Sequence, residues 1–392
     1  MILSHKIRIY PNKEQEVFLK KSCGVARFAY NWGLAEWKKQ YKYGEKPNYL
    51  KLKKQFNGIK RADFPFTCEV SKCCTETAFA NLGKAYKNFF YKRAKYPKFK
   101  KKGIYDSFGL NNLNFHINGK HIKLAKMQPM KMAEPLRFDG KIMSCTVSCV
   151  AGKWYISIAV DVQKDLTLPK TGKYVGVDLG VKDIAITSDG YKFANPRWIQ
   201  KSEKKLKRLQ RELARRKRAS KRRERTRLRL ARKHNQVANQ RRDWLHKLTT
   251  YLVRNYDVIS LEDLNVRGMV KNHNLAKAIT NVSFGEFNRQ IEYKAQMYGK
   301  QIYRVDRFFP SSKTCSVCGC IQDKMPLNVR EWTCPDCGAH HDRDINAAQN
   351  LLRQAMPEVT HGERPALVIS EISDITKLDS LNREPYKIIC YE

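Results

Sequence analysis

The chain has 392 residues, 42% of them hydrophobic, which is enough for two or three domains with buried cores. It contains 77 Lys and Arg against 37 Asp and Glu, and this net charge of +40 indicates a polyanionic partner such as nucleic acid. The alternative explanation of this charge is a basic surface of the ribosomal-protein type, or one that only keeps the protein soluble. No run of eighteen apolar residues and no signal-peptide pattern is present, so we expect neither a membrane span nor secretion.

The first hundred residues predict one strand followed by helices. Residues 5–10 alternate apolar and polar side chains as a strand does, and a helical pattern starts at Lys13. Further helical patterns cover 30–43, 50–56 and 72–93. In the stretch 92–102, basic residues alternate with two aromatic residues, a composition too polar for a core. It suits a segment that follows a phosphate backbone while its rings stack on bases.

From about residue 104 to 165 the hydrophobic pattern changes to a period of two, which is typical of strands. Turn sequences such as Asn118-Gly119 and Asp139-Gly140 separate these strands. The strand at 5–10 can join the same sheet. We therefore expect a β-barrel that is interrupted by a helical insertion.

A third region begins near Gly172. Residues 173–180 predict a buried strand that carries Asp178 between apolar neighbours, and the next two short strands complete the opening meander of an RNase H-type sheet. A long helical segment, 200–250, contains a very basic run whose like charges would repel one another without an anionic partner. A nucleic-acid contact is therefore favoured there over a merely solvated helix. A further buried strand, 256–263, ends in two acids, and 356–392 is expected to be a poorly ordered tail.

Twelve cysteines are present, and four of them have the spacing of a structural zinc site. Cys315 and Cys318 form one Cys-x-x-Cys pair, and Cys334 and Cys337 form the second pair after fifteen residues. Four thiolates fill a tetrahedron, so this zinc would be scaffold rather than catalyst. The other cysteines show no disulfide framework, and we expect them to be reduced, mostly buried thiols in a reducing cytoplasm.

Three acids, Asp178, Glu262 and Asp344, each lie at the edge of an apolar element. In an RNase H-like sheet the first and fourth strands are neighbours, and a helix opening at Asp344 can pack beside them, so the three carboxylates would converge. Such oxygen ligands suit Mg²⁺ or Mn²⁺, and two such ions can hydrolyse a phosphodiester. Alternation along the strand does not by itself choose between Glu262 and its neighbour Asp263.

Four segments in this order resemble the TnpB (OrfB) family, which bacterial and archaeal insertion sequences encode. They are Gly-Val-Asp-Leu-Gly at 176–180, Leu-Glu-Asp-Leu-Asn-Val-Arg-Gly-Met at 261–269, Phe-Pro-Ser-Ser-Lys-Thr-Cys-Ser-Val-Cys-Gly at 309–319, and the stretch 334–350 that contains Asp-Arg-Asp-Ile-Asn-Ala-Ala. Residues 6–15 and 238–249 are also similar to that family, and the resemblance covers about residues 5–355.

The resemblance implies an RNA-guided DNA endonuclease related to type V CRISPR effectors, working in the prokaryotic cytoplasm at the nucleoid. Its expected partners are a guide RNA made from the transposon end and target double-stranded DNA beside a short flanking motif. By motif, the catalytic acids would be Asp178, Glu262 and Asp344, holding Mg²⁺ or Mn²⁺. The zinc ligands implied are Cys315, Cys318, Cys334 and Cys337.

The implied fold class is α+β and multidomain. The expected parts are a wedge-like β-barrel at 1–12 and 104–168, a helical recognition domain at 13–103, a RuvC-like nuclease domain at 169–311 and 339–355, and a zinc ribbon at 312–338. Three rival functions remain: a nuclease-dead RNA-guided repressor, a transposase that performs strand transfer, and a ribosome-associated zinc protein. The presence of all three acids argues against the first and the last.

Overall fold

The computed structural model describes residues 1–326 and 328–355, which form two compact units, Met1–Lys164 and the part from Asp165 onward. Both units mix helices and strands, so the expected α+β class is confirmed. The tail expected at 356–392 lies outside the described residues. Within the described ranges, every helix is too short or too polar to cross a membrane.

The first unit is built on a seven-stranded antiparallel, barrel-like sheet in which β1 (Ile2–Tyr10) is a central strand. β1 pairs with β7 (Lys153–Asp161) from Ile2 to Ile9 and with β5 (Met130–Met132) at its end, which confirms that the first strand joins the later sheet. The remaining strands are β2 (Ser107–Asn111), β3 (Phe115–Asn118), β4 (His121–Leu124) and β6 (Lys141–Val150), in the sheet order β2-β6-β7-β1-β5-β4-β3.

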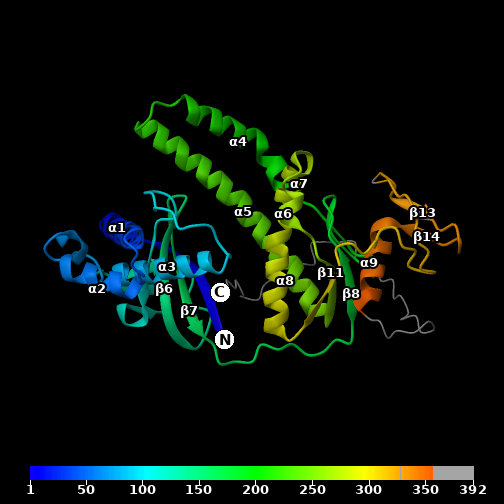
Figure 1. Ribbon diagram of the computed structural model, residues 1–392, viewed down its shortest axis with the longest axis horizontal. Helices are drawn as coiled ribbons and strands as arrows, with labels where there is room; N and C mark the ends of the chain where they lie inside the picture. Colours follow the sequence, from blue (N-terminus) through cyan, green and yellow to red (C-terminus); the bar gives the residue numbers. More distant parts are fainter. Residues whose placement is uncertain (327, 356–392) are drawn as a thin grey trace. The chain divides into compact units, whose positions relative to one another are not determined.

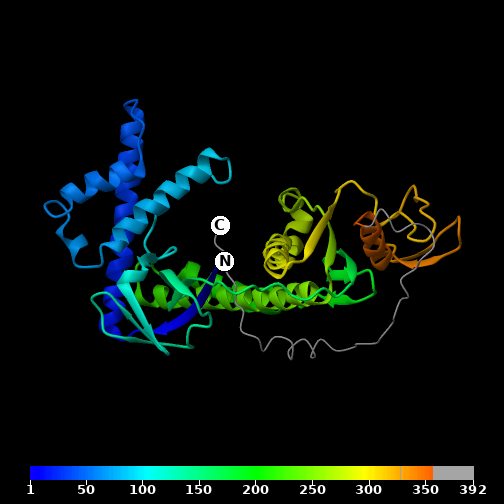
Figure 2. The ribbon, with the colours of Figure 1, turned by 90° about the horizontal axis from the view of Figure 1, so that it is seen from below.

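Apart from a short 3₁₀ turn after β2 (Asn112–Asn114), the helices of this unit lie between β1 and β2 in the sequence, as the interrupted-sheet pattern predicts. They are α1 (Lys13–Lys42), α2 (Tyr49–Ile59), the 3₁₀ turn Pro65–Cys68 and α3 (Cys73–Phe90), and Figure 2 shows them in blue to cyan. Asn12 starts α1 with a capping box to Gln15, and the helix then runs unbroken, so the separate helix expected from residue 30 is wrong. Their shared core contains Phe56, Phe79 and Leu82.

The second unit is built on a five-stranded sheet in the order β10-β9-β8-β11-β12, of which β8 and β11 are labelled in Figure 1. β8 and β11 are parallel neighbours, so the first and fourth strands of this unit lie side by side as expected. β12 continues the parallel part, whereas β9 and β10 pair antiparallel. The strands are β8 (Tyr174–Asp178), β9 (Asp183–Thr187), β10 (Lys192–Ala194), β11 (Val258–Glu262) and β12 (Gln301–Val305).

The basic segment expected as one helix over 200–250 is instead a helical hairpin (Figure 1). α4 (Trp198–Arg215) ends where Arg216 turns to an extended conformation. α5 (Lys221–Asn255) then begins with Ser220, whose side chain accepts the N–H of Arg223. Three further helices follow β11: α6 (Val266–Met269), α7 (His273–Val282) and α8 (Phe284–Tyr298).

The last described helix, α9 (Arg343–Ala355), lies directly against β8 and follows a small hairpin of β13 (Glu331–Thr333) and β14 (His340–Asp342). The approach is backbone to backbone, because a Cβ at Gly176 would lie 1.9 Å from the carbonyl oxygen of Ala348. Ser260 on β11 adds a buried hydrogen bond to the carbonyl of Leu351, at 2.6 Å. These contacts fix the position of α9 along the sheet.

Candidate active site

Two of the predicted acids end neighbouring parallel strands. Val177 on β8 pairs with Leu261 on β11, and Asp178 and Glu262 are the residues that follow directly. Both acids are half-buried. Because the strands are parallel and in register, the two carboxylates leave the sheet at the same edge.

The third acid reaches this edge from α9. Ala348 on α9 lies over Gly176 on β8. Asp344 comes one helical turn before Ala348, and Asp178 comes two residues after Gly176. Four helical residues rise ~6 Å and two strand residues ~6.6 Å, so an α9 antiparallel to β8 carries Asp344 toward Asp178. The structure therefore brings all three predicted acids to one edge of the sheet.

The protonation of Asp178 reflects this crowding. Burial, followed by the negative charges of Asp344 and Glu262, raises the pKa of Asp178 to about 7. The pKa of Glu262 is also raised, mainly by burial and then by the charge of Asp263. Carboxylates that repel one another in this way, and so raise the pKa, become ionised together when a cation lies among them.

Asp263, the rival to Glu262, has a different environment. Its side chain is exposed and forms an ion pair with Arg307, in the loop after β12. Asp263 is therefore bound to a cation of its own, while its charge still contributes to the raised pKa of Glu262. This placement favours Glu262 over Asp263, and the catalytic assignment of all three acids stays a prediction.

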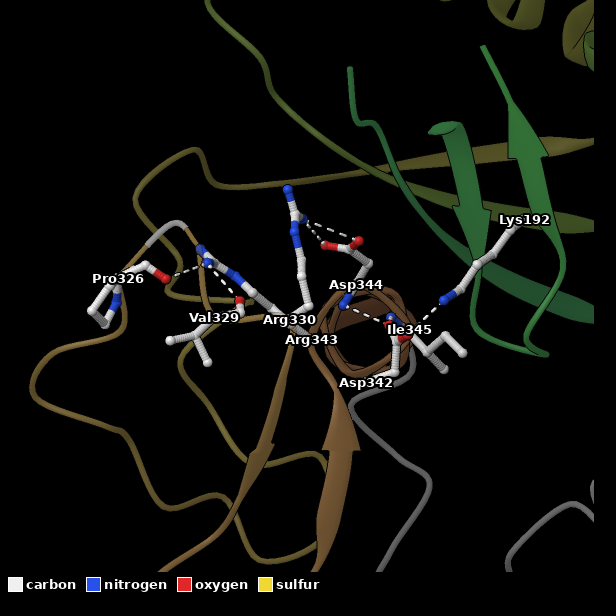
Figure 3. Close-up of polar contacts among 8 residues, drawn as sticks. All are labelled: Lys192, Pro326, Val329, Arg330, Asp342, Arg343, Asp344 and Ile345. Carbon is white, nitrogen blue, oxygen red and sulfur yellow. Dashed lines mark hydrogen bonds and ion pairs between the residues drawn. The ribbon is translucent and has the colours of Figure 1, made fainter. Parts of the chain in front are cut away.

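Asp344 has a cationic partner that the sequence analysis missed. The Nη1 atom of Arg330 lies 3.2 and 3.3 Å from the two carboxylate oxygens of Asp344 (Figure 3). Arg330 comes directly before β13, in the segment between the two cysteine pairs. In a chain with 77 basic residues, no sequence signal separates this arginine from the others.

The turn that carries Asp344 is held by its neighbours. Asp342 caps α9, because its Oδ1 accepts the N–H groups of Asp344 at 3.0 Å and Ile345 at 3.1 Å. Lys192 on β10 forms an ion pair with the same Asp342 (Figure 3). Burial alone would raise the pKa of Asp342, but the hydrogen bonds to its carboxylate, that from Lys192 first, outweigh this effect and lower the pKa. Arg343 donates to backbone carbonyls of the preceding loop, those of Pro326 and Val329.

The four predicted cysteines lie together. The Sγ atoms of Cys315, Cys318, Cys334 and Cys337 are all within 4.8 Å of one another, and in residues 1–326 and 328–355 this is the one His, Cys, Asp or Glu group of such compactness. Two of the sulfur–sulfur distances are 3.7 and 3.5 Å. A tetrahedral zinc ion with bonds of about 2.3 Å separates its sulfurs by about 3.8 Å, so the geometry fits zinc.

The protonation of the thiols and a nearby histidine describe the surroundings of this cysteine cluster. A backbone N–H from Cys337 helps to lower the pKa of Cys334 to about 7, whereas burial and hydrogen bonds to neighbouring sulfurs raise the pKa of Cys318 and of Cys337. Of these three thiols, Cys334 is therefore the one that ionises most readily before a metal binds. The Nε2 atom of buried His341 lies 3.0 Å from the sulfur of Cys315. Neither His341 nor Cys320 belongs to the compact group, which agrees with the cysteine set chosen from the sequence.

Amide side chains of α9 join the cysteine cluster to the sheet. Asn346 accepts the N–H of Ser316 at 2.8 Å and donates to the carbonyl of Thr314, also at 2.8 Å. Asn350 donates to Ser311 and Thr314. Both amides are almost fully buried, so the segment before the first cysteine pair is fastened to the helix that carries Asp344.

The remaining cysteines are mixed in exposure. Cys23, Cys73, Cys74 and Cys145 are buried as predicted, and Cys149 and Cys320 are half-buried. Cys68, at the end of the 3₁₀ turn, is exposed, which is compatible with the expectation that these cysteines are mostly buried. Cys390 lies outside the described residues.

The α4–α5 hairpin presents a basic surface. Its few acids are engaged locally: Glu212 accepts from Arg216 at 3.1 Å and from Thr226 at 2.9 Å. A concave surface along α4 is lined by Lys204, Lys207, Arg208, Glu212, Arg211, Arg215 and Arg216. This concentration of cations agrees with a polyanion contact and adds no base-specific geometry.

Comparison with known proteins adds three family matches. Residues 157–273 match the OrfB_IS605 family, described as "Probable transposase"; residues 284–351 match a Cas12f1-like TNB domain; and residues 1–46 match a helix-turn-helix domain of the same OrfB group. In this chain the third match covers a strand and one continuous helix, with the start of the following turn.

Two relatives match over almost their whole length. A Streptomyces pristinaespiralis protein named "Putative RNA-guided DNA endonuclease" is 36% identical, covering 97% of this chain and 96% of its own. A similarly named Escherichia coli protein, InsQ, is 30% identical over 91% and 93% of the two chains. Among solved structures, the mini-RNA-guided endonuclease CRISPR-Cas_phi3 is 10% identical with a TM-score of 0.48, covering 91% and 92%. That likeness is too distant to carry an argument.

Proposed function

The chain belongs to the TnpB (OrfB) family, and on that premise we propose that it is an RNA-guided DNA endonuclease of a transposable element. It would bind a guide RNA made from the element's end and cut target DNA beside a short flanking motif. The observation that carries the proposal is the gathering of Asp178, Glu262 and Asp344 at one sheet edge, within a chain of net charge +40.

The chemistry would follow from these carboxylates. Asp178, Glu262 and Asp344 would hold Mg²⁺ or Mn²⁺, which when bound activates water and neutralises charge on the phosphodiester. The raised pKa of Asp178 means that ionising all three carboxylates is unfavourable unless a bound cation balances their charge. Arg330, now paired with Asp344, would exchange this carboxylate for a DNA phosphate, the anion that an arginine fork binds well.

The cysteine cluster would hold structural zinc. Its four sulfurs leave no open coordination position, so the residues of the ribbon would act by placing β13, β14 and the first turn of α9. Through Asn346 and Asn350, residues 311–316, which lead into the first cysteine pair, are hydrogen-bonded to α9. Zinc would thus support the position of Asp344 without taking part in the cut.

The two units would divide the work. We assign the first, with its sheet and inserted helices, to wedge and recognition functions at 1–12, 104–168 and 13–103. The second would be the RuvC-like nuclease, with the zinc ribbon at 312–338 inserted in it. Base pairing of guide and target would supply sequence specificity, while the basic surfaces hold the nucleic-acid backbones.

The test is a guided cleavage assay. The protein is expressed with its flanking element DNA, its co-purifying RNA is sequenced, and a plasmid library with a matching target and random flanks is offered with Mg²⁺. We expect cutting beside one enriched flanking motif. Asp178→Asn, Glu262→Gln and Asp344→Asn should keep the RNA and lose cutting, whereas Asp263→Asn, the matched control, should still cut.

Other outcomes would assign a different function. Full cutting by Glu262→Gln with loss in Asp263→Asn would move the site to the neighbouring acid. Absence of a discrete RNA would refute the guided mechanism. The family description "Probable transposase" raises strand transfer as the second candidate. Joined transposon ends in the same reaction, rather than simple cuts, would favour it.

A further inference from the structure

The segment that joins α3 to β2 carries exposed rings among cations. It runs from Phe90 to Tyr105 and is called here the aromatic–basic segment. Seven of its side chains are Lys or Arg and none is acidic, although its composition alone does not exclude a solvated linker. Its exposed rings are Phe90 (63%), Tyr91 (62%), Tyr96 (41%), Phe99 (48%) and Tyr105 (91%).

The aromatic–basic segment is fastened to the helices beneath it. Asn31 on α1 makes two hydrogen bonds to the backbone of Lys100, at 2.9 and 2.8 Å. The hydroxyl of Tyr96 lies 2.9 Å from that of Tyr86 on α3. The rings are therefore presented from fixed backbone positions, which lowers the conformational entropy that a ligand must remove on binding.

Tyr105 is the most exposed ring and its backbone is strained. Its φ is +55°, in the left-handed region that side chains other than glycine avoid at a cost of about 1–2 kcal/mol. The following Asp106 holds this conformation, because it pairs with Arg27 at 2.9 Å and accepts the N–H of Gly103 at 3.0 Å. Strain of this kind persists where the surroundings impose it and clusters at functional surfaces.

Cations lie over the faces of the neighbouring rings. Lys38 on α1 lies 4.8 Å from the ring centre of Phe99 and 5.5 Å from that of Tyr96, and Arg93 lies 5.5 Å from that of Tyr91. Within the described residues, neither a cation nor another ring packs on the ring of Tyr105. Positive charges and solvent-exposed rings therefore lie close together along this segment.

This alternation fits unpaired nucleotides. Phosphates would contact the lysines and arginines, and unpaired bases would stack on the rings, which contacts every base type. A double helix offers its phosphates but keeps its bases stacked on each other, so it would leave the rings without a role. The geometry points to a single strand as the occupant, and we propose that the aromatic–basic segment binds one, with Tyr91 and Tyr105 as stacking platforms.

This inference rests on the proposed function only in taking nucleic acid as the partner. It names a site in the first unit, separate from the acids, and it does not specify whether the strand is RNA or DNA. The two share phosphates and bases, and the experiment below separates them.

The test measures binding by the full-length chain without cutting. Labelled twelve-nucleotide single-stranded RNA, single-stranded DNA and duplex DNA are titrated by fluorescence anisotropy in buffer that lacks Mg²⁺ and Mn²⁺, so that the zinc stays bound and no cutting occurs. Tyr105→Leu and Tyr91→Leu should each weaken single-strand binding by roughly 5- to 100-fold, the range expected for one lost stacking contact. Tyr105→Phe should bind as the wild type does, because it keeps the ring.

Controls separate stacking from general loss of charge or fold. Tyr174→Leu removes an exposed tyrosine from the second unit and should leave binding unchanged. Lys101→Gln should instead reduce the salt dependence of binding, by a slope of about 0.7 for a single strand. Duplex binding should be equal in wild type and Tyr105→Leu.

The outcomes are distinct. Tighter binding of RNA or of DNA, each lost in Tyr105→Leu, supports the proposal and identifies the strand. Equal binding by wild type and both leucine variants overturns it, as does equal loss of duplex and single-strand binding. Because no cutting is measured, failure here leaves the proposed endonuclease intact, and failure of the guided cleavage assay leaves this binding result standing.

Discussion

Replacing Asp178 with Asn should stabilise the second unit at pH 8, even though it removes a candidate catalytic acid. In the folded protein the pKa of Asp178 is raised from 3.8 to about 7, chiefly by burial and by the charges of Asp344 and Glu262. Each unit of difference corresponds to 1.36 kcal/mol, so the ionised carboxylate lowers the free energy of unfolding by about 4 kcal/mol at alkaline pH.

The pH window follows from these two values. Below about pH 4, Asp178 is protonated in both states and the penalty is absent. As the pH rises from about 4 to 7, the folded state keeps a proton that the unfolded state has lost, so stability falls. Above about pH 7 the penalty is complete, and it is there that the Asn variant should differ most from the wild type.

The assay is urea unfolding of both zinc-loaded proteins at pH 4, 6 and 8, without chelator and without added Mg²⁺ or Mn²⁺. Asp243→Asn, an exposed acid of α5 paired with Lys247, is the control and should change stability by less than about 1 kcal/mol. Adding Mg²⁺ at pH 8 should stabilise the wild type more than the Asn variant, since binding to the folded state adds stability. A difference that does not change with pH, or an Asn variant less stable at pH 8, would refute the reasoning.

Three further predictions concern α9 and the ribbon. Gly176→Ala should destabilise the second unit by about 3 kcal/mol or more in urea unfolding, because the added Cβ would meet backbone atoms of α9. Gly285→Ala, whose Cβ would meet nothing within 4 Å, should leave the stability unchanged. Equal stabilities of the two variants would contradict the packing of α9 on β8. Zinc chelation, or Cys334→Ser, should expose 311–342 to limited proteolysis, and an unchanged digestion pattern would count against structural zinc. Arg330→Gln should tighten Mn²⁺ binding several-fold, measured by electron paramagnetic resonance, because the cation no longer competes for Asp344; weaker binding would argue that the arginine supports the site.

The sheet of the second unit was predictable from local pattern. Residues 173–180 and 256–263 are short, largely apolar runs that were predicted as buried strands, and the structure has strands within both. The cysteine spacing likewise predicted which four sulfurs meet. These signals are local, because each is decided by residues that lie close together in the sequence.

What the sequence left open depends on tertiary contacts. Choosing between Glu262 and Asp263 needs the partner strand and the Arg307 ion pair, which are distant in the sequence. The break in the basic helix at Arg216 follows no proline or glycine, so helical periodicity could not show it. Arg330 is one of 77 cations, and only the fold of the hairpin brings it to Asp344.

The covering of β8 by α9 also has a consequence for synthesis. Asp178 and Asp344 are separated by about 170 residues, which a ribosome adding ~5–20 residues per second takes about 10–30 s to make. During that time the face of β8 and β11 that carries Gly176 and Ser260 lacks the helix that covers it. The acid edge is assembled only when the last described helix emerges, so no partial chain that ends before α9 can contain the complete set of acids.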